Sequence, residues 1–284
     1  MTRIFLFFMW LVHFLPLPVI EAIGRFFGGL VYYFGRRRVT RTNLALCFPE
    51  KTDAERKQVA KQLFKNLGGA FMQASVLWWS PPLRVTELCD LKGRENLDTL
   101  KGQPVILLSP HFTGLDIGGA RVGYEWQLCS MYSEQKNQAF DKVLLAGRKR
   151  FGDPHLVTRA QGLRPVVKYL KQGVPFLYLP DMDFGAKDSV FVPFFGVQTA
   201  TVTALTRLCQ MTGAKVVPSI TKRVGAKYET TLYPAWGNFP GASPEDDAAH
   251  MNKFIEDRVR ETPEQYFFVH KRFKTRPPGE PSIY

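Results

Sequence analysis

Residues 105–116 read VILLSPHFTGLD and are the most informative segment of the chain. It joins a short apolar run, Val105–Leu108, to His111 and Asp116 through a turn that contains Gly114. An unbroken apolar run of this length is typical of a strand that is buried on both faces of a parallel sheet. The polar turn that follows such a strand lies at the carboxyl edge of the sheet, where α/β proteins bind ligands. The stretch therefore predicts an α/β fold with a candidate site at that edge.

Helix and strand patterns alternate along the rest of the chain. A capping box at Thr52 and Glu55 opens a long amphipathic helix that ends before Pro81. Further helices are expected from Pro165 to Gly173, from Val202 to Gly213 and from Ser243 onward, and further strands at 174–179, from 216 and at 228–233. No repeat or flexible linker divides residues 40–284. The order predicts a mixed, largely parallel sheet flanked by helices.

The N-terminus predicts a membrane anchor. Residues 4–20 carry no formal charge, and the apolar character continues to Phe34. Spanning a bilayer takes about 20 mostly apolar residues, so the length suffices. Four arginines follow at 36, 37, 38 and 41, against a single Arg3 before the apolar stretch, and this bias places the following domain in the cytoplasm. We therefore expect an anchor over residues 1–34 and a cytoplasm-facing domain over residues 35–284.

Two other interpretations of the N-terminus compete with a spanning helix. A signal peptide could be cleaved near residues 22–24, but the apolar stretch runs past that point into the arginines. An interfacial helical hairpin is as plausible as a span, because Pro16, Pro18, His13 and Glu21 disfavour one straight, deeply inserted helix. Membrane attachment is predicted in either case.

Charge and cysteine content limit the classes of protein further. Lys and Arg number 38 against 25 Asp and Glu, a formal charge of +13 that favours an anionic partner. A nucleic-acid-binding protein is disfavoured, because the strongest basic run follows an apolar segment and no nucleic-acid motif is present. The four cysteines form no CxxC pair, which disfavours a disulfide scaffold or zinc ribbon and suits a reduced compartment.

His111 and Asp116 are candidates for acid–base chemistry. Their spacing across a turn lets the carboxylate accept a proton from one imidazole nitrogen, which leaves the other free as a general base. The H-x4-D pattern alone is weak, since a histidine at a strand end is more often a structural hydrogen bonder. The chain has no G-x-S-x-G elbow, phosphate loop or G-x-G-x-x-G motif. A base without an enzymic nucleophile suits direct attack by a substrate hydroxyl on an activated acyl group.

The H-x4-D motif on a basic, membrane-tethered α/β chain resembles the lysophospholipid acyltransferase superfamily. Further blocks are similar to the bacterial lipid A late acyltransferases, in that family's order: RKRFG (148–152), RAQGLRP (159–165), LPDMDFG (179–185), VFVPFFG (190–196) and QYFFVHKRFKTR (265–276). Residues 132–135, YSEQ, depart from the basic character expected there. The resemblance implies an acyltransferase-like fold.

The same resemblance implies an activity and a set of roles. The family moves a fatty acyl chain from acyl carrier protein to a hydroxyl of a 3-hydroxyacyl chain on a phosphorylated glucosamine-disaccharide lipid, at the cytoplasmic side of the bacterial inner membrane. His111 would deprotonate the hydroxyl and Asp116 would orient His111. Arg159 would hold a substrate phosphate or the thioester oxyanion, with Arg148 and Arg164 as further substrate-binding residues. Another membrane lipid, such as a lysophospholipid, glycolipid or ornithine lipid, is the alternative acceptor.

Several residues also have a structural interpretation. Arg159 could form an ion pair with Asp181 or Asp183, and those two carboxylates are more typical of a turn than of a metal site, since one pair supplies too few ligands. Phe191–Phe195 is either core or the wall of an acyl tunnel. We expect no metal and no cofactor.

Overall fold

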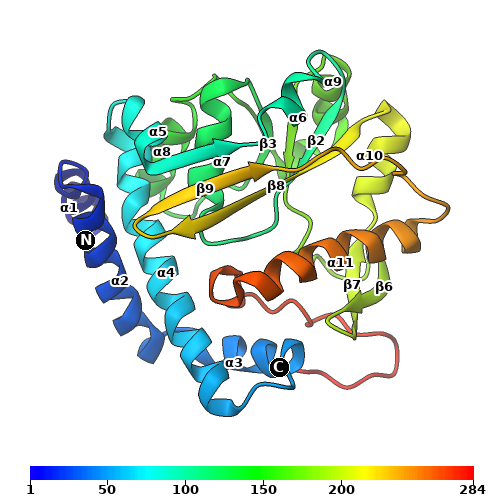
Figure 1. The fold of residues 1–284 in the computed structure, drawn as a ribbon, viewed down its shortest axis with the longest axis horizontal. Helices are drawn as coiled ribbons and strands as arrows, with labels where there is room; N and C mark the ends of the chain where they lie inside the picture. Colours follow the sequence, from blue (N-terminus) through cyan, green and yellow to red (C-terminus); the bar gives the residue numbers. More distant parts are fainter.

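The computed structural model describes residues 1–284. A seven-stranded twisted sheet forms its centre, with helices packed around it (Figure 1). All neighbouring strands in this sheet are parallel except β8 and β9. In spatial order the strands are β1 (Cys89–Lys92), β9 (Lys227–Leu232), β8 (Lys215–Val224), β2 (Val105–Leu108), β5 (Phe176–Tyr178), β3 (Cys129–Tyr132) and β4 (His155–Thr158). The expected mixed, largely parallel sheet is confirmed.

The remaining elements surround this sheet. A separate antiparallel hairpin consists of β6 (Ser189–Phe194) and β7 (Val197–Val202). The helices are α1 (Thr2–Val12), α2 (Leu17–Phe34), α3 (Arg37–Cys47), α4 (Asp53–Trp79), α5 (Leu83–Leu88), α6 (Glu95–Asp98), α7 (Leu115–Glu125), α8 (Gln138–Arg148), α9 (Arg164–Lys171), α10 (Ala204–Thr212) and α11 (Pro244–Glu261), with short 3₁₀ turns η1 (Arg159–Gln161) and η2 (Pro263–Gln265).

Strand β2 is buried on both faces, as its apolar run predicts. Ile106 and Leu108 pack into the core that also contains α9, α10 and α11, whereas Val105 and Leu107 face a second core with α6 and α7. The Thr52–Glu55 capping box at the start of α4 is also present. The Phe191–Phe195 run, which the sequence allows to be core or tunnel wall, forms most of β6, and Phe194 and Phe195 pack into the larger core.

The N-terminal apolar stretch is a broken helix pair. The chain leaves α1 at His13, and α2 begins after Pro16, so no single helix covers residues 4–20. Only α2 is long and apolar enough to cross a membrane, a weak indication by itself. It lies along α4 (Figure 1), where Gly24 and Gly28 approach the backbone of α4 so closely that a Cβ on either would clash. Glu21 of α2 accepts a hydrogen bond from Arg223 Nε of β8 at 2.9 Å, which ties α2 to the sheet domain.

Candidate active site

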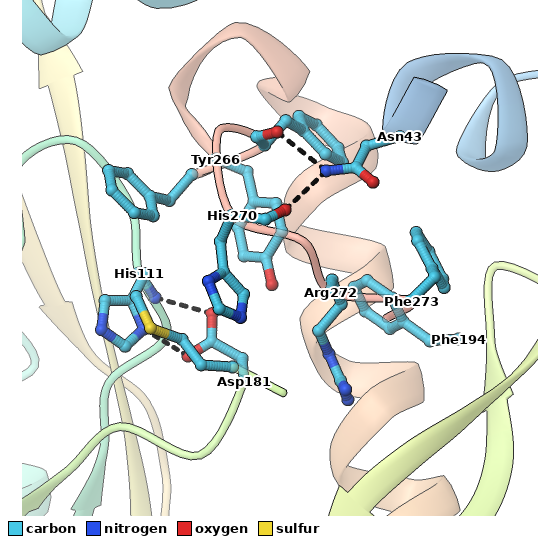
Figure 2. A pocket seen from close by; sticks show the side chains of 11 residues that line it. Asn43, His111, Asp181, Phe194, Tyr266, His270, Arg272 and Phe273 are labelled. Atoms are coloured by element: carbon cyan, nitrogen blue, oxygen red, sulfur yellow. Dashed lines mark hydrogen bonds and ion pairs between the residues drawn. The ribbon is translucent and has the colours of Figure 1, made fainter. Parts of the chain in front are cut away.

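His111 and Asp181 meet at the carboxyl edge of the sheet. Each follows a parallel strand, β2 and β5 respectively, and these strands are neighbours with Leu108 beside Tyr178. The imidazole Nδ1 lies 2.7 Å from one carboxylate oxygen of Asp181, and the backbone N–H of His111 donates to the other oxygen at 2.8 Å (Figure 2). The Asp181 side chain is 2% exposed and the His111 side chain 19%. The carboxylate is thus buried, whereas the imidazole is partly exposed and accessible to a substrate.

The two groups favour each other's charged forms. Burial alone would raise the pKa of the Asp181 carboxyl, but the charge and the hydrogen bonds of His111 lower it. Burial would likewise lower the pKa of His111, yet the charge and hydrogen bond of Asp181 outweigh burial and raise it, with a smaller contribution from Asp116. An ionised Asp181 fixes the tautomer with the proton on Nδ1, so Nε2 is the nitrogen available to take a proton.

The prediction that Asp116 forms a hydrogen bond with His111 is wrong. Asp116 lies in the first turn of α7, where its side chain is 63% exposed and accepts from Arg148 at 3.0 Å. The turn before α7 directs this carboxylate outward, and Asp181 takes the position on the imidazole. The Arg148 guanidinium also lies 5.6 Å from the centroid of the Tyr132 ring. Asp116 thus pairs with Arg148 and makes no hydrogen bond to the imidazole.

The C-terminal segment completes the site from the far end of the sequence. Thr113 N–H donates to the carbonyl of Gln265 at 2.8 Å, and Phe267 N–H donates to the carbonyl of His111 at 2.9 Å. These bonds form an isolated antiparallel bridge between residues 265–267 and the His111 loop, with Phe112 opposite Tyr266. The backbone of the proposed base is thereby held from both sides.

Asp183 fastens the next part of this segment. Its carboxylate accepts from the N–H and the hydroxyl of Thr275 at 2.6 and 2.8 Å, and its own N–H donates to His270 Nε2 at 3.0 Å. Burial, followed by the charge of Arg272, lowers the pKa of His270, consistent with a neutral ring that accepts this bond. The Asp181–Asp183 pair is thus divided between two tasks, one carboxylate on the imidazole and the other on the C-terminal segment.

Arg159 and Arg164 follow β4 on the same side of the sheet. The Arg159 guanidinium lies 5.4 Å from the centroid of Phe184, and no ion pair joins it to Asp181 or Asp183. The structural interpretation of Arg159 as their partner is therefore wrong. Arg164, at the first position of α9, is exposed. Both arginines are free to meet an anionic substrate group, whereas Arg148 is already paired with Asp116.

A small cavity lies behind the imidazole and the carboxylate. It measures about 10 Å³ and is lined by residues that include Asp181, Tyr266, His270 and Arg272 (Figure 2). That volume is close to the room for one water molecule. The cavity is too small for an organic molecule, which leaves the exposed side of the His111 ring as the open approach.

Sequence reasoning missed Asp181 as the partner of His111, together with the contribution of the C-terminal segment. A usable signal existed for Asp181, since it is the first carboxylate after the buried strand β5. Only the strand order, which puts β5 next to β2, shows that it meets His111.

Similarity to known proteins identifies the family of this chain. The bacterial lipid A biosynthesis acyltransferase family matches residues 1–275. The chain is 35% identical over 283 residues to the lipid A biosynthesis lauroyltransferase of Escherichia coli K12, covering 97% of this chain and 92% of that protein. It is 33% identical over 268 residues to the myristoyltransferase of the same organism, covering 93% and 82%. Among solved structures, the Thermotoga maritima 1-acyl-sn-glycerophosphate acyltransferase PlsC aligns with TM-score 0.43 and 14% identity over 84% of this chain and 96% of that one. On the family match and these relatives, the chain belongs to the bacterial lipid A biosynthesis acyltransferase family.

Proposed function

We propose that this protein transfers a fatty acyl chain from acyl carrier protein to a hydroxyl of a 3-hydroxyacyl chain on a phosphorylated glucosamine-disaccharide lipid A precursor. The observation that carries the proposal is the His111–Asp181 pair at the carboxyl edge of the sheet, in a chain whose family match covers residues 1–275. The names of its relatives specify lauroyl, myristoyl and palmitoleoyl transfer, which supports a long-chain acyl group without fixing its length.

The chemistry follows from the free imidazole nitrogen. His111 Nε2 removes the proton of the acceptor hydroxyl, and the oxygen attacks the carbonyl carbon of the acyl thioester. The tetrahedral intermediate collapses with cleavage of the carbon–sulfur bond, and the imidazolium returns the proton to the departing thiolate. Asp181 stabilises the imidazolium that forms between these steps, since its ionised carboxylate is held against Nδ1.

The arginines supply charge for the substrates. Arg159 and Arg164, free of ion pairs, bind an anionic group such as the acceptor phosphate or the oxyanion. Arg148 contributes a third guanidinium, and Asp116 acts as its positioning residue. Acyl carrier protein is acidic, so the net charge of +13 also favours its encounter with the enzyme.

Residues 1–34 attach the protein to the cytoplasmic side of the inner membrane, with residues 35–284 as the catalytic domain. The packing supports attachment in the plane of the interface rather than a span, because one face of α2 is buried against α4 while its other face is apolar and exposed. The Glu21–Arg223 bond would also leave a charged pair in the bilayer core if α2 crossed the membrane.

The test is a transfer assay with product identification. Purified protein is incubated with a panel of acyl carrier protein thioesters and the lipid A precursor, and the product is analysed by mass spectrometry. We expect one added ester-linked acyl chain, from a preferred thioester. The same assay with His111→Ala should give no product, and His250→Ala serves as its control, because His250 is exposed on α11. Acylation of a lysophospholipid or ornithine lipid in place of the precursor would refute the proposed acceptor.

A further inference from the structure

A basic hollow lies between α3 and the start of α4. It is separate from the cavity beside His111, with which it shares no lining residue. Its volume is about 350 Å³, within the range of small-ligand sites. We call it the arginine hollow, and its polar lining consists of Arg37, Arg38, Arg41, Thr42, Asp53 and Arg56.

Three of its four guanidinium groups are free. Arg56 donates to Asp53 at 2.8 Å and to the carbonyl of Phe48 at 3.0 Å, so it is engaged in the loop between α3 and α4. The three arginines of α3 form no ion pair and no side-chain hydrogen bond. Four arginines against one carboxylate leave the hollow with a charge of +3. No carboxylate other than Asp53 lines the hollow to offset this excess.

The local structure of α3 adds to the unbalanced charge. Arg37 and Arg38 lie in its first turn, where the helix dipole disfavours cations, and the N-cap residue Arg36 provides no side-chain cap. Arg37 and Arg41 are four residues apart, a spacing at which like charges repel. The other face of α3 is buried and held in place, because the Asn43 amide donates hydrogen bonds to the carbonyls of Phe268 and His270 (Figure 2). A bound anion would relieve both the repulsion and the uncapped terminus.

The surroundings indicate which anion fits. The apolar helix α2 ends at Phe34, whose side chain is 91% exposed, only two residues before Arg36. Further exposed apolar side chains on α2 are Phe26, Phe27, Leu30, Val31 and Tyr33. If these side chains enter the hydrocarbon boundary, the arginines just beyond them lie at the level of the headgroups. An acidic protein partner would account for the charge but not for the adjoining apolar face.

We propose that the arginine hollow binds the phosphate of an anionic membrane phospholipid, held by Arg37, Arg38 and Arg41. The site is separate from acyl transfer, and the proposal rests on membrane attachment alone. It would fix the depth and the orientation of the α1–α2 pair at the membrane.

The test measures lipid binding to the full chain in dodecyl maltoside micelles by native mass spectrometry, with phosphatidylglycerol and phosphatidylcholine of the same acyl chains. We expect the wild type to bind phosphatidylglycerol at least about tenfold more tightly than phosphatidylcholine. Each basic residue near an anionic surface contributes about fivefold to binding, so the double variant Arg38→Gln with Arg41→Gln should bind phosphatidylglycerol up to about 25-fold more weakly. Phosphatidylcholine binding should not change. The matched control is Arg36→Gln with Lys57→Gln, two exposed cations outside the hollow, and it should change binding less than about threefold.

Several results would overturn the site. Equal losses of phosphatidylglycerol affinity in the two double variants would show that the charges act only at long range. A wild type that binds both lipids equally would exclude a headgroup site. Displacement of the lipid by millimolar glycerol phosphate would point to a soluble phosphate ligand. Variants that keep lipid binding but lose affinity for acyl carrier protein would point to the protein partner. A wild type that binds neither lipid would also exclude the headgroup site, but it would leave attachment by the α1–α2 pair intact, because the detergent micelle already covers the exposed apolar side chains of α2.

Discussion

Replacement of Asp181 by Asn tests the centre of the proposed mechanism. The carboxylate accepts two hydrogen bonds from His111, one from the backbone N–H and one from Nδ1. An amide has one acceptor oxygen, and the backbone N–H can only donate. The oxygen must therefore serve the backbone, which turns the NH₂ group toward Nδ1. The imidazole can meet that donor only as the other tautomer, with its proton on Nε2, where the base must be free.

The size of the effect follows from this forced tautomer. Loss of general-base catalysis costs about 10²–10⁴-fold in rate, and the same substitution in a Ser-His-Asp triad costs about 10⁴-fold. We expect Asp181→Asn to lower kcat by about 10³-fold, which corresponds to roughly 4 kcal/mol of transition-state stabilisation. Because the amide replaces a fully buried charge partner, the free energy of unfolding should also fall by about 1–3 kcal/mol.

The assay compares kcat and KM at saturating acyl donor for Asp181→Asn and Asp116→Asn, with urea unfolding of both. Asp116 is exposed and bonded to Arg148, so its variant should retain wild-type stability and show its main effect on KM for the lipid acceptor. Near-normal kcat for Asp181→Asn, with a large loss of kcat for Asp116→Asn, would refute the assignment and make Asp116 the partner of His111 during turnover.

The other predictions concern the base, its protonation, the substrate arginine and the N-terminal helix. His111→Ala should lose about 10²–10⁴-fold in kcat with its circular dichroism spectrum unchanged, while His250→Ala keeps normal kcat. Because Asp181 raises the pKa of His111 and the base must be neutral, kcat/KM should fall as pH drops through a value above the ordinary 6.5. In a pH–rate profile, Asp181→Asn should move this acid limb to lower pH, and a limb that stays in place would contradict the pairing. Arg159→Lys should impair transfer almost as much as Arg159→Ala, since an ammonium lacks the planar guanidinium fork, and normal kinetics for the Lys variant would show that charge alone suffices. Gly28→Val should destabilise the protein by at least about 1–3 kcal/mol, because an added Cβ would lie 2.2 Å from a backbone oxygen of α4. Gly29→Val, with 3.7 Å of room, is the matched control, and equal melting temperatures would contradict close α2–α4 packing.

The predictable parts of the fold were those with local physical causes. The apolar run of β2 requires burial on both faces, and the Thr52–Glu55 box caps α4 through residues three positions apart. The short strands β1, β3 and β4 carried no such signal. Their pairing depends on neighbours that are remote in sequence, so single-sequence patterns could not reveal them.

The site residues also differ in whether a local sequence pattern reveals them. His111 could be found because a polar residue after a buried strand stands out locally. Its partner could not be found in this way, because the local spacing favours Asp116 whereas Asp181 lies 70 residues away in the sequence. Length and hydropathy predict an anchor in the N-terminal stretch, but they carry no information on the glycine contacts that hold α2 against α4.

The placement of the C-terminal segment has a consequence for synthesis of the protein. Asn43 binds the carbonyl of His270, 227 residues later, and His111 receives its backbone partner from Phe267. At about 5–20 residues per second, a ribosome needs roughly 10–45 s to cover that distance. The helices α1 and α2 are synthesised before the sheet, so on the proposed function they can meet the membrane while the sheet is still being made. Since the site lacks one side until residues 265–276 are released, the nascent chain would be localised before it is active. On the proposed function, such a chain is held at its bilayer before residues 265–276 have completed the pocket that does the chemistry.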